Sequence, residues 1–295
     1  MGILAFLAAE REVVDTGLDR LLPPSEAWPR RLHDAMRYAV FGGGKRVRPI
    51  LARVACQAAG GDPELILEAA CALELIHTYS LIHDDLPALD NDSLRRGRPT
   101  VHIAYDEPLA ILAGDALLTE AFVVLGTHPR GEAMVARRAE ACCLVALAAG
   151  SRGMVGGQVE DLEATGKAPD AQRLERIHRA KTGALLAASV ELGAVLAGVD
   201  GEVRRRFASF GQSLGLAFQI ADDILDVTGT AASLGKSPGK DKEAGKLTYP
   251  AVFGLAATRH ELTRLSASLR TEAQALEGPG GRLAPLVDYI ASRDR

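Results

Sequence analysis

Long runs of apolar residues at three- and four-residue steps are the feature that most restricts the fold of this chain. Between residues 63 and 83 the recurring apolar side chains are Leu65, Ala69, Ala72, Leu73, Ile76 and Leu81. This spacing lines one face of an α-helix. The same pattern runs through 110–126, 137–149, 172–198, 202–227, 249–277 and 283–292. Aromatic residues are only 4% of the chain, which disfavours an all-β fold.

The breaks between these segments are mostly short connections that contain Gly or Pro. No long Pro-, Ser- or Gly-rich linker divides the chain, so we predict one all-α domain over residues 1–295, built from about ten helices. The stretch 228–245 differs, because it has eighteen residues rich in Gly, Lys and Ser. Loops longer than about 12–15 residues in a compact domain are usually functional or disordered. We interpret it either as a basic flap or as a solvated loop.

The charge balance limits the choice of partners. The chain has 34 Lys and Arg against 38 Asp and Glu, a net charge of −4 and a pI near 6.0. Proteins held on nucleic acid by bulk charge are usually basic, so we expect no nucleic acid partner.

Three features indicate a cytoplasmic protein without a membrane-spanning segment. The four cysteines form no C-x-x-C pair and are interpreted as reduced thiols. The N-terminus has no basic segment before its short apolar run, so we predict no signal peptide. The longest apolar stretch, 184–199, is shorter than about 18 residues and contains Glu191, which indicates a buried helix instead of a membrane span.

Two clusters of aspartates each follow an apolar helical segment, so they are expected near the core and not on a polar face. In the second cluster Asp222 and Asp226 are spaced i, i+4, which puts both carboxylates on one helix face. In the first cluster Asp84 and Asp90 are six residues apart with Pro87 between them. An ideal helix would point them in different directions, but a distortion at the proline could bring Asp90 back toward Asp84. A solvated helix end remains the alternative for each cluster.

Cationic residues lie close to these clusters in the sequence. Lys45 and Arg48 follow a run of three glycines, and Arg95 and Arg96 come shortly after the first acidic cluster. Mg²⁺ is typically bound by one or two carboxylates together with substrate phosphates. Arginine forks match phosphate oxygens in a bidentate manner. The combination indicates a phosphate-bearing substrate held by Mg²⁺, although each basic group alone could be a surface ion-pair patch.

Six segments together carry a family resemblance. In order they are FGGGKRVRP, LIHTYSLIHDDLPALDND, LRRGRPT, KTGALL, FQIADDILD and GKSPGKDKEAGKLTYP. The chain closely resembles the trans-isoprenyl diphosphate synthases over nearly its whole length, and the short-chain bacterial farnesyl diphosphate synthases in particular. The resemblance implies an all-α bundle of the isoprenoid synthase type around a deep central cavity, with the two acidic motifs facing each other at its mouth. It also implies a homodimer.

The resemblance implies roles for individual residues. The expected Mg²⁺ ligands, for about three ions with substrate bound, are Asp84, Asp90, Asp222 and Asp226, with Asp85 and Asp223 as auxiliary ligands or supporting residues. The expected contacts to the allylic diphosphate are Arg95, Lys181 and Lys236, and those to the diphosphate of isopentenyl diphosphate are Lys45, Arg48, His77 and Arg96. Lys181, Thr182 and Gln219 are expected near the reacting carbons. His83 and His102 have no such support and are interpreted as structural.

The implied reaction is a Mg²⁺-dependent condensation of isopentenyl diphosphate with dimethylallyl or geranyl diphosphate. Diphosphate leaves C1 of the allylic substrate, the double bond of isopentenyl diphosphate attacks that carbon, and a proton is lost to the released diphosphate. The product is farnesyl diphosphate, with geranylgeranyl diphosphate as the alternative. Tyr79 and Ser80 lie about one helical turn before Asp84, and a large aromatic there resembles the C15 pattern, with Tyr79 as the cavity floor.

Three other readings fit less of the sequence. His83 and Asp84 spell the core pair of an HD-type phosphohydrolase, but the second acidic motif would then have no purpose. A terpene cyclase has no reason to bind a second diphosphate. An inactive regulatory subunit tends to lose an acidic motif, and both motifs are intact here.

Overall fold

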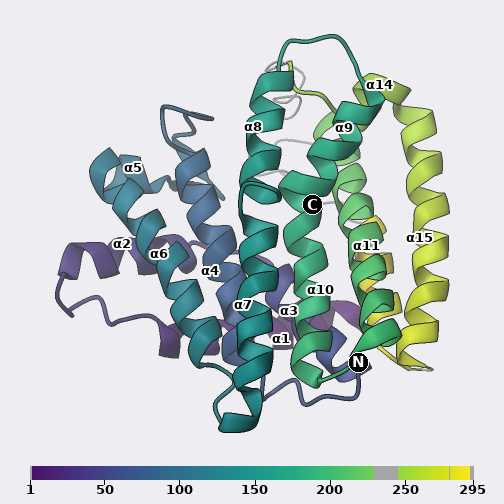
Figure 1. The fold of residues 1–295 in the computed structure, drawn as a ribbon. Helices are drawn as coiled ribbons and strands as arrows, with labels where there is room; N and C mark the ends of the chain where they lie inside the picture. Colours follow the sequence, from purple (N-terminus) through teal and green to yellow (C-terminus); the bar gives the residue numbers. More distant parts are fainter. Residues whose placement is uncertain (1, 229–244, 279, 293–295) are drawn as a thin grey trace. The chain divides into compact units, whose positions relative to one another are not determined.

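The computed structural model describes residues 2–228, 245–278 and 280–292, and most of these residues lie in helices (Figure 1). The strands in the described part are two segments of two residues each, paired antiparallel. The prediction of an all-α fold is therefore confirmed.

The chain divides into two compact units. Unit 1 comprises 1–53 and 64–142, and unit 2 comprises 54–63 and 143–295. The boundary passes through two helices, α3 (Val47–Ala58) and α7 (Val135–Ala149), each of which contributes residues to both units. The prediction of a single domain over 1–295 stays a prediction.

Unit 1 is built around α4, which runs from Leu67 to Asp84 and packs against α6. Its further elements are α1 (Ile3–Leu21), α2 (Arg30–Val40), β1 (Leu94–Arg95), β2 (Arg98–Pro99), α5 (Val101–Ala104), α6 (Glu107–Thr127) and the 3₁₀ turn η1 (Glu132–Met134). Twelve of the eighteen residues of α4 are buried, so this helix forms the core of the unit and carries its Asp84 end on a rigid support. The contact with α6 is close at Gly114, where an added Cβ would lie 2.2 Å from Nε2 of His83.

Unit 2 is centred on α10 and α11, which pack along each other (Figure 1). Both also pack against the π-helix η2. Its elements are α8 (Met154–Ala164), α9 (Ala171–Ile177), η2 (His178–Gly183), α10 (Ala184–Ala197), α11 (Gly201–Thr228), α14 (Tyr249–Phe253), α15 (Leu255–Glu277) and α16 (Leu283–Ala291). The aromatic rings of Phe207 and Phe210 on α11 are fully buried. The acidic motif lies in the C-terminal part of the same helix.

The helical periodicity locates seven of the long segments but misses several helices. The helices α1, α2, α3 and α8 lie outside the predicted segments. α2 carries five charged or histidine side chains among its eleven residues, and α8 contains two adjacent glycines, so neither shows a long apolar run. The predicted segment 249–277 is divided at Gly254, whose φ of +80° ends α14.

Two helical stretches of the described chain are long and apolar enough to cross a membrane by length and composition alone. They are Glu107–Thr127 and Ala171–Ala197. The second is longer than the apolar stretch 184–199 noted in the sequence, because it also includes α9 and η2. Within their units α6 packs on α4 and α10 packs on α11. The absence of membrane insertion stays a prediction.

Candidate active site

The first acidic motif turns back on itself at the end of α4. The amide of Asp90 donates a hydrogen bond to the carbonyl oxygen of Asp84 at 2.9 Å, and the amide of Asn91 donates to Leu86 at 3.1 Å. Asn91 has a φ of +50°, a left-handed conformation that asparagine tolerates better than most residues. The distortion after α4 therefore brings the backbones of Asp84 and Asp90 together, although six residues of sequence separate them.

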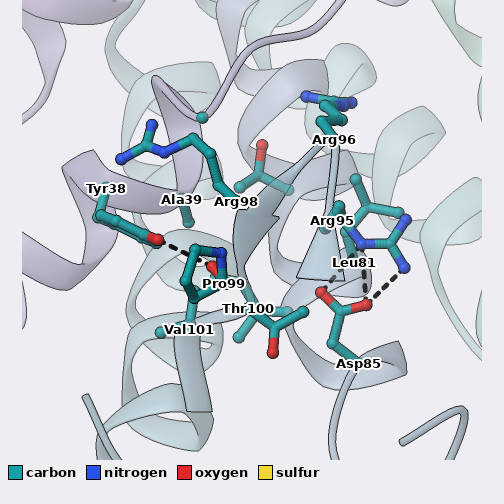
Figure 2. Close-up of a pocket in the computed structure, with 13 residues that line it drawn as sticks. Tyr38, Ala39, Leu81, Asp85, Arg95, Arg96, Arg98, Pro99, Thr100 and Val101 are labelled. Atoms are coloured by element: carbon teal, nitrogen blue, oxygen red, sulfur yellow. Dashed lines mark hydrogen bonds and ion pairs between the residues drawn. The ribbon is translucent and has the colours of Figure 1, made fainter. Parts of the chain in front are cut away.

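Asp85, which follows Asp84 in the sequence, is paired with an arginine. Asp85 is 3% exposed and accepts hydrogen bonds from Nε of Arg95 at 2.8 and 2.9 Å, with a further bond from Nη2 (Figure 2). Burial raises the pKa of Asp85, although the hydrogen bond and charge of Arg95 act in the opposite direction. Burial lowers the pKa of Arg95, but the hydrogen bond and charge of Asp85 outweigh it and the net shift is upward. Arg95 thus reduces the effect of burial on the pKa of Asp85 but does not reverse it, whereas Asp85 raises the pKa of Arg95 above its ordinary value.

Arg95 and Arg96 reach their positions through a two-residue hairpin. Leu94 pairs with Pro99 and Arg95 with Arg98. The connecting residues Arg96 and Gly97 have φ of +53° and +76°, as a type I′ turn requires.

Tyr38 of α2 fixes this hairpin. Its hydroxyl donates to the carbonyl of Pro99 at 2.8 Å, and its ring lies 4.3 Å under the guanidinium of Arg98 (Figure 2). These contacts form one wall of a pocket that the hairpin shares with α2 and α4. The hairpin was not predicted from the sequence, because two-residue strands have no periodicity to detect.

Several positive side chains surround His77 in unit 1. Burial lowers the pKa of His77 well below its usual value, and the charges that lower it further come from Arg48, Arg96, Arg95 and Arg46. Burial also lowers the pKa of Arg96, whose Nη1 donates to the carbonyl of Gly43. A cluster that disfavours its own positive charges is suited to binding an anion such as a diphosphate. Of the predicted contacts to isopentenyl diphosphate, Lys45 is exposed and Arg48 is buried at the start of α3.

Arg46, which lies between Lys45 and Arg48 in the sequence, is buried and bound to other protein groups. Its side chain is 2% exposed and donates to Asp15 at 2.7 Å, to Glu74 at 2.8 Å and to the carbonyl of Val40 at 2.7 Å. Glu74 lies on α4 one turn before His77. The pair therefore ties the loop that carries Lys45 to the helix that carries His77.

The second acidic motif lies on α11 in unit 2. Asp222 is half-buried and Asp226 is 5% exposed, and the i, i+4 spacing keeps both on one face of the helix. Asp223 is turned inward and accepts hydrogen bonds from His178 and Tyr249, both at 2.8 Å, and from Gln219 at 2.9 Å.

The predicted residues Lys181 and Thr182 lie on the π-helix η2. Single π-turns inside α-helices occur frequently at functional sites. Nζ of Lys181 lies 2.7 Å from Oδ2 of Asp161 on α8, and Asp161 is a residue that sequence reasoning missed. The backbones are also close, because a Cβ added at Gly157 would lie 2.2 Å from the Lys181 nitrogen.

The donors present fit Mg²⁺. Asp84 with Asp90, and Asp222 with Asp226, are pairs of hard oxygen ligands, and Mg²⁺ takes one or two carboxylates beside phosphate and water. Among the described residues no three or more His, Cys, Asp or Glu side chains gather into a metal cage. Each of the two carboxylate pairs could hold Mg²⁺ together with a diphosphate.

Other predicted residues have the following places. Tyr79 is 6% exposed, and its ring makes an edge contact with His83 at 5.8 Å. Ser80 is half-buried and donates to the carbonyl of His77. His83 bonds the carbonyl of Ile111 at 3.1 Å, a contact of a structural residue. Lys236 lies outside the described residues. Each unit carries one acidic motif, and the expectation that the motifs face each other stays a prediction.

The sequence and the fold of this chain are similar to those of known proteins from one family. The profile of the family described as polyprenyl synthetase matches residues 29–278. A farnesyl diphosphate synthase of Geobacillus stearothermophilus is 42% identical over 294 residues, which are 100% of this chain and 99% of that protein. A geranylgeranyl diphosphate synthase of Cyanophora paradoxa is 43% identical over 296 residues, 99% of this chain and 97% of that protein. The apo crystal structure of an FPP/GFPP synthase from Zymomonas mobilis matches with a TM-score of 0.86 and 36% identity, over 98% of this chain and 99% of that one.

Proposed function

The chain belongs to the polyprenyl synthetase family and is a prenyl diphosphate synthase, and on that premise we propose that its product is farnesyl diphosphate. The reaction joins isopentenyl diphosphate to dimethylallyl diphosphate and then to geranyl diphosphate, with release of pyrophosphate at each step. The observation that carries the proposal is the combination, in unit 1, of the Asp84 and Asp90 carboxylates with the cationic cluster around His77.

The residues of the cationic cluster would hold the diphosphate of isopentenyl diphosphate. Arg48 and Arg96 lie near enough to His77 to lower its pKa, and a bound diphosphate would relieve this mutual repulsion. Lys45 is exposed three residues before the buried Arg48. Arginine forks and a lysine point charge are the groups that recognise phosphate oxygens.

The allylic diphosphate would be held by Arg95, Lys181 and Lys236. Enzymes of this family are generally Mg²⁺-dependent. Bound Mg²⁺ would neutralise the charge of the leaving diphosphate, and its ligands in this proposal are Asp84, Asp90, Asp222 and Asp226. Within unit 1 the positive charge for the diphosphate would come from Arg95, and within unit 2 from Lys181.

Gln219 and Thr182 would face the allylic cation. The amide nitrogen of Gln219 donates to Asp223, so the amide oxygen, which carries partial negative charge, is the end available to stabilise a cation. The double bond of isopentenyl diphosphate attacks C1, a proton leaves the adduct, and pyrophosphate accepts that proton. The proposal therefore needs no protein side chain as general base.

Product length separates two candidate products. Relatives of similar identity are named both as farnesyl and as geranylgeranyl diphosphate synthases. The buried Tyr79, five residues before Asp84, supports a short product, because a bulky ring beside the elongating chain limits its length. Geranylgeranyl diphosphate is the second candidate.

One assay tests the function and the product. The purified chain is incubated with Mg²⁺, isopentenyl diphosphate and dimethylallyl diphosphate, and released pyrophosphate is measured while the dephosphorylated products are separated by chromatography. We expect pyrophosphate and a C15 alcohol. A C20 alcohol would favour the second candidate, and absence of pyrophosphate release would contradict the proposed function.

We also propose a cytoplasmic homodimer, as the family resemblance implies. Val155, Val159 and Leu162 form an apolar row on α8 and are 45%, 51% and 47% exposed, which gives a surface that an association could cover. Light scattering of the purified chain would measure its mass in solution, and a monomer at micromolar concentration would contradict the dimer.

A further inference from the structure

A buried hydrogen-bonded node joins three elements of unit 2. Asp223 is 2% exposed and the side chain of His178 is 4% exposed. Oδ2 of Asp223 accepts from Nε2 of His178 at 2.8 Å and from the amide of Tyr249 at 2.8 Å, while Oδ1 accepts from Gln219 at 2.9 Å. The donors belong to η2, α14 and α11, so one carboxylate holds three segments together.

Both oxygens of this carboxylate are thus committed inside the protein. A buried polar group is stable only when its hydrogen-bonding capacity is used, and Asp223 meets that condition with protein donors alone. Its neighbour Asp222 is half-buried and points in another direction, since successive residues of a helix are turned by about 100°. The two adjacent aspartates therefore have different surroundings although they belong to one motif.

The proton of His178 can be placed from its contacts. With the proton on Nε2, the ring donates to Asp223. Nδ1 is buried and has no hydrogen-bond partner among the described residues, so a proton there would be an unpaired buried donor. The ring also packs on Tyr249, with the ring centres 5.4 Å apart.

The segment that this node fixes carries two residues that we propose as substrate contacts. His178 is the first residue of the π-helix η2, and Lys181 and Thr182 follow within the same turn. On one side an added Cβ at Gly157 of α8 would meet the Lys181 backbone. On the other side an added Cβ at Gly215 of α11 would lie 2.7 Å from Cα of Gly183. The π-helix is packed tightly by backbones, and the His178–Asp223 bond fixes its start against α11.

We propose that His178 and Asp223 are positioning residues, which hold η2 so that Lys181 and Thr182 are presented to the allylic substrate. In this arrangement Asp223 acts through His178 and Gln219, and the Mg²⁺ ligands of the second motif are Asp222 and Asp226. The inference rests on the proposed function for its kinetic consequences, but the fixing of η2 has consequences that need no substrate.

The variants are chosen to separate the hydrogen bond from the packing. His178→Gln keeps a nitrogen donor near the position of Nε2, whereas His178→Leu keeps the volume and removes the donor. His260→Leu is the matched control, because His260 is exposed on α15. In His178→Leu we expect kcat to fall about 10- to 100-fold, because a displacement of about 1 Å in a reacting group has effects of this size. The KM for the allylic diphosphate is expected to rise, while that for isopentenyl diphosphate stays within about twofold.

His178→Gln is expected to recover most of the loss. Asp223→Asn should show the same kinetic pattern as His178→Leu with an unchanged Mg²⁺ concentration for half-maximal activity. A tenfold higher Mg²⁺ requirement in Asp223→Asn would show that Asp223 is a ligand and would overturn the inference. Equal kcat in His178→Leu and the wild type would also overturn it.

Hydrogen–deuterium exchange supplies the readout without substrate. We expect faster exchange in the peptide covering 178–183 in His178→Leu, with wild-type exchange in His178→Gln and in the control. Unchanged exchange in His178→Leu would overturn the inference whatever the kcat of that variant. If the wild-type protein transfers no prenyl group, the proposed function is wrong. The exchange measurement would still decide whether the His178–Asp223 bond fixes η2. If His178→Leu does not fold, the comparison of Asp223→Asn with the wild type decides by the same two measurements.

Discussion

The guanidinium of Arg95 binds both carboxylate oxygens of Asp85, which stands in the sequence between Asp84 and Asp90, the two residues of this motif that we propose as Mg²⁺ ligands. Asp85 is buried and has Arg95 as a partner, whereas Asp84 and Asp90 are half-buried. The second aspartate of the other motif, Asp223, is likewise engaged with protein donors. In both motifs the second aspartate is used to hold protein groups in place.

A double-mutant cycle tests whether Asp85 acts through Arg95. Asp85→Ala and Arg95→Ala are each expected to raise the KM for the allylic diphosphate, and the double variant should be little worse than either single variant. The coupling energy between contacting residues is about 0.5–3 kcal/mol. If the two effects on kcat/KM add, Asp85 has a function of its own and the paired role is wrong.

Removal of a proposed metal ligand should abolish turnover without unfolding the protein. For Asp84→Ala and Asp222→Ala we expect kcat to fall by about three orders of magnitude, because the metal contributes several kcal/mol of charge stabilisation. Each change should alter the free energy of unfolding by less than about 0.5 kcal/mol, since neither side chain fills the core. Steady-state kinetics at saturating Mg²⁺ and circular dichroism measure the two effects.

Asp200→Ala is the control for these variants, because Asp200 is exposed between α10 and α11, away from the motif. It should retain wild-type turnover. More than a tenth of wild-type activity in Asp84→Ala or Asp222→Ala would contradict the assignment of that carboxylate to Mg²⁺.

The two diphosphate sites should respond to different lysines. Lys45→Ala is expected to raise the KM for isopentenyl diphosphate, and Lys181→Ala that for the allylic substrate, because each removes a charge-assisted hydrogen bond. Such a bond contributes about 1.5–3 kcal/mol, or roughly 10- to 150-fold in KM. Lys236→Ala should resemble Lys181→Ala. Initial rates with one substrate varied at a time measure both constants, with exposed Lys167→Ala as the control. Equal changes for both substrates in Lys45→Ala would contradict the separation.

His77 predicts a pH dependence of stability. Burial and the neighbouring arginines lower its pKa in the folded state well below 6.5, so the unfolded chain binds a proton at a higher pH than the folded chain does. The free energy of unfolding should therefore fall as the pH drops below 6.5, by about 1.4 kcal/mol per pH unit for this one group. Above that pH its contribution is constant.

His77→Gln removes the titration and isolates it. The free energy of unfolding of the wild type, relative to that of His77→Gln, should fall by about 1 kcal/mol from pH 6.5 to 5.5, because His77 in the unfolded chain is already half protonated at pH 6.5. Denaturant unfolding at each pH measures this change. A difference that is constant over this range would show that His77 has an ordinary pKa in the folded protein.

The sequence was sufficient for the all-α fold class, because periodicity is a local property of the chain, and Pro87 indicated a distortion that could bring Asp90 back toward Asp84. The sequence did not predict which side chains pair with the buried charged residues. His178 is 45 residues from Asp223, and nothing in either segment indicates that they meet. Such pairings depend on how helices pack, and a pattern within one helix does not specify them.

Tyr79 gives the last prediction, which concerns product length. Its side chain is 6% exposed on α4, and burial raises the pKa of its hydroxyl, with the charge of Asp84 as a second cause. If this ring is the floor of the elongation site, Tyr79→Ala opens space below the growing chain and a C20 product should appear. The change should also lower the free energy of unfolding by about 3–5 kcal/mol, because truncation of a buried aromatic leaves a cavity.

Tyr79→Phe is the matched variant, since it keeps the ring and should keep the C15 product. Chromatography of the dephosphorylated products measures the length, and thermal unfolding measures the loss of stability in Tyr79→Ala. Ser80→Ala, on the next position of α4, tests whether the neighbouring half-buried side chain also limits the product. A folded and active Tyr79→Ala enzyme that still stops at C15 would show that other side chains set the length, because the volume removed would then lie away from the prenyl chain.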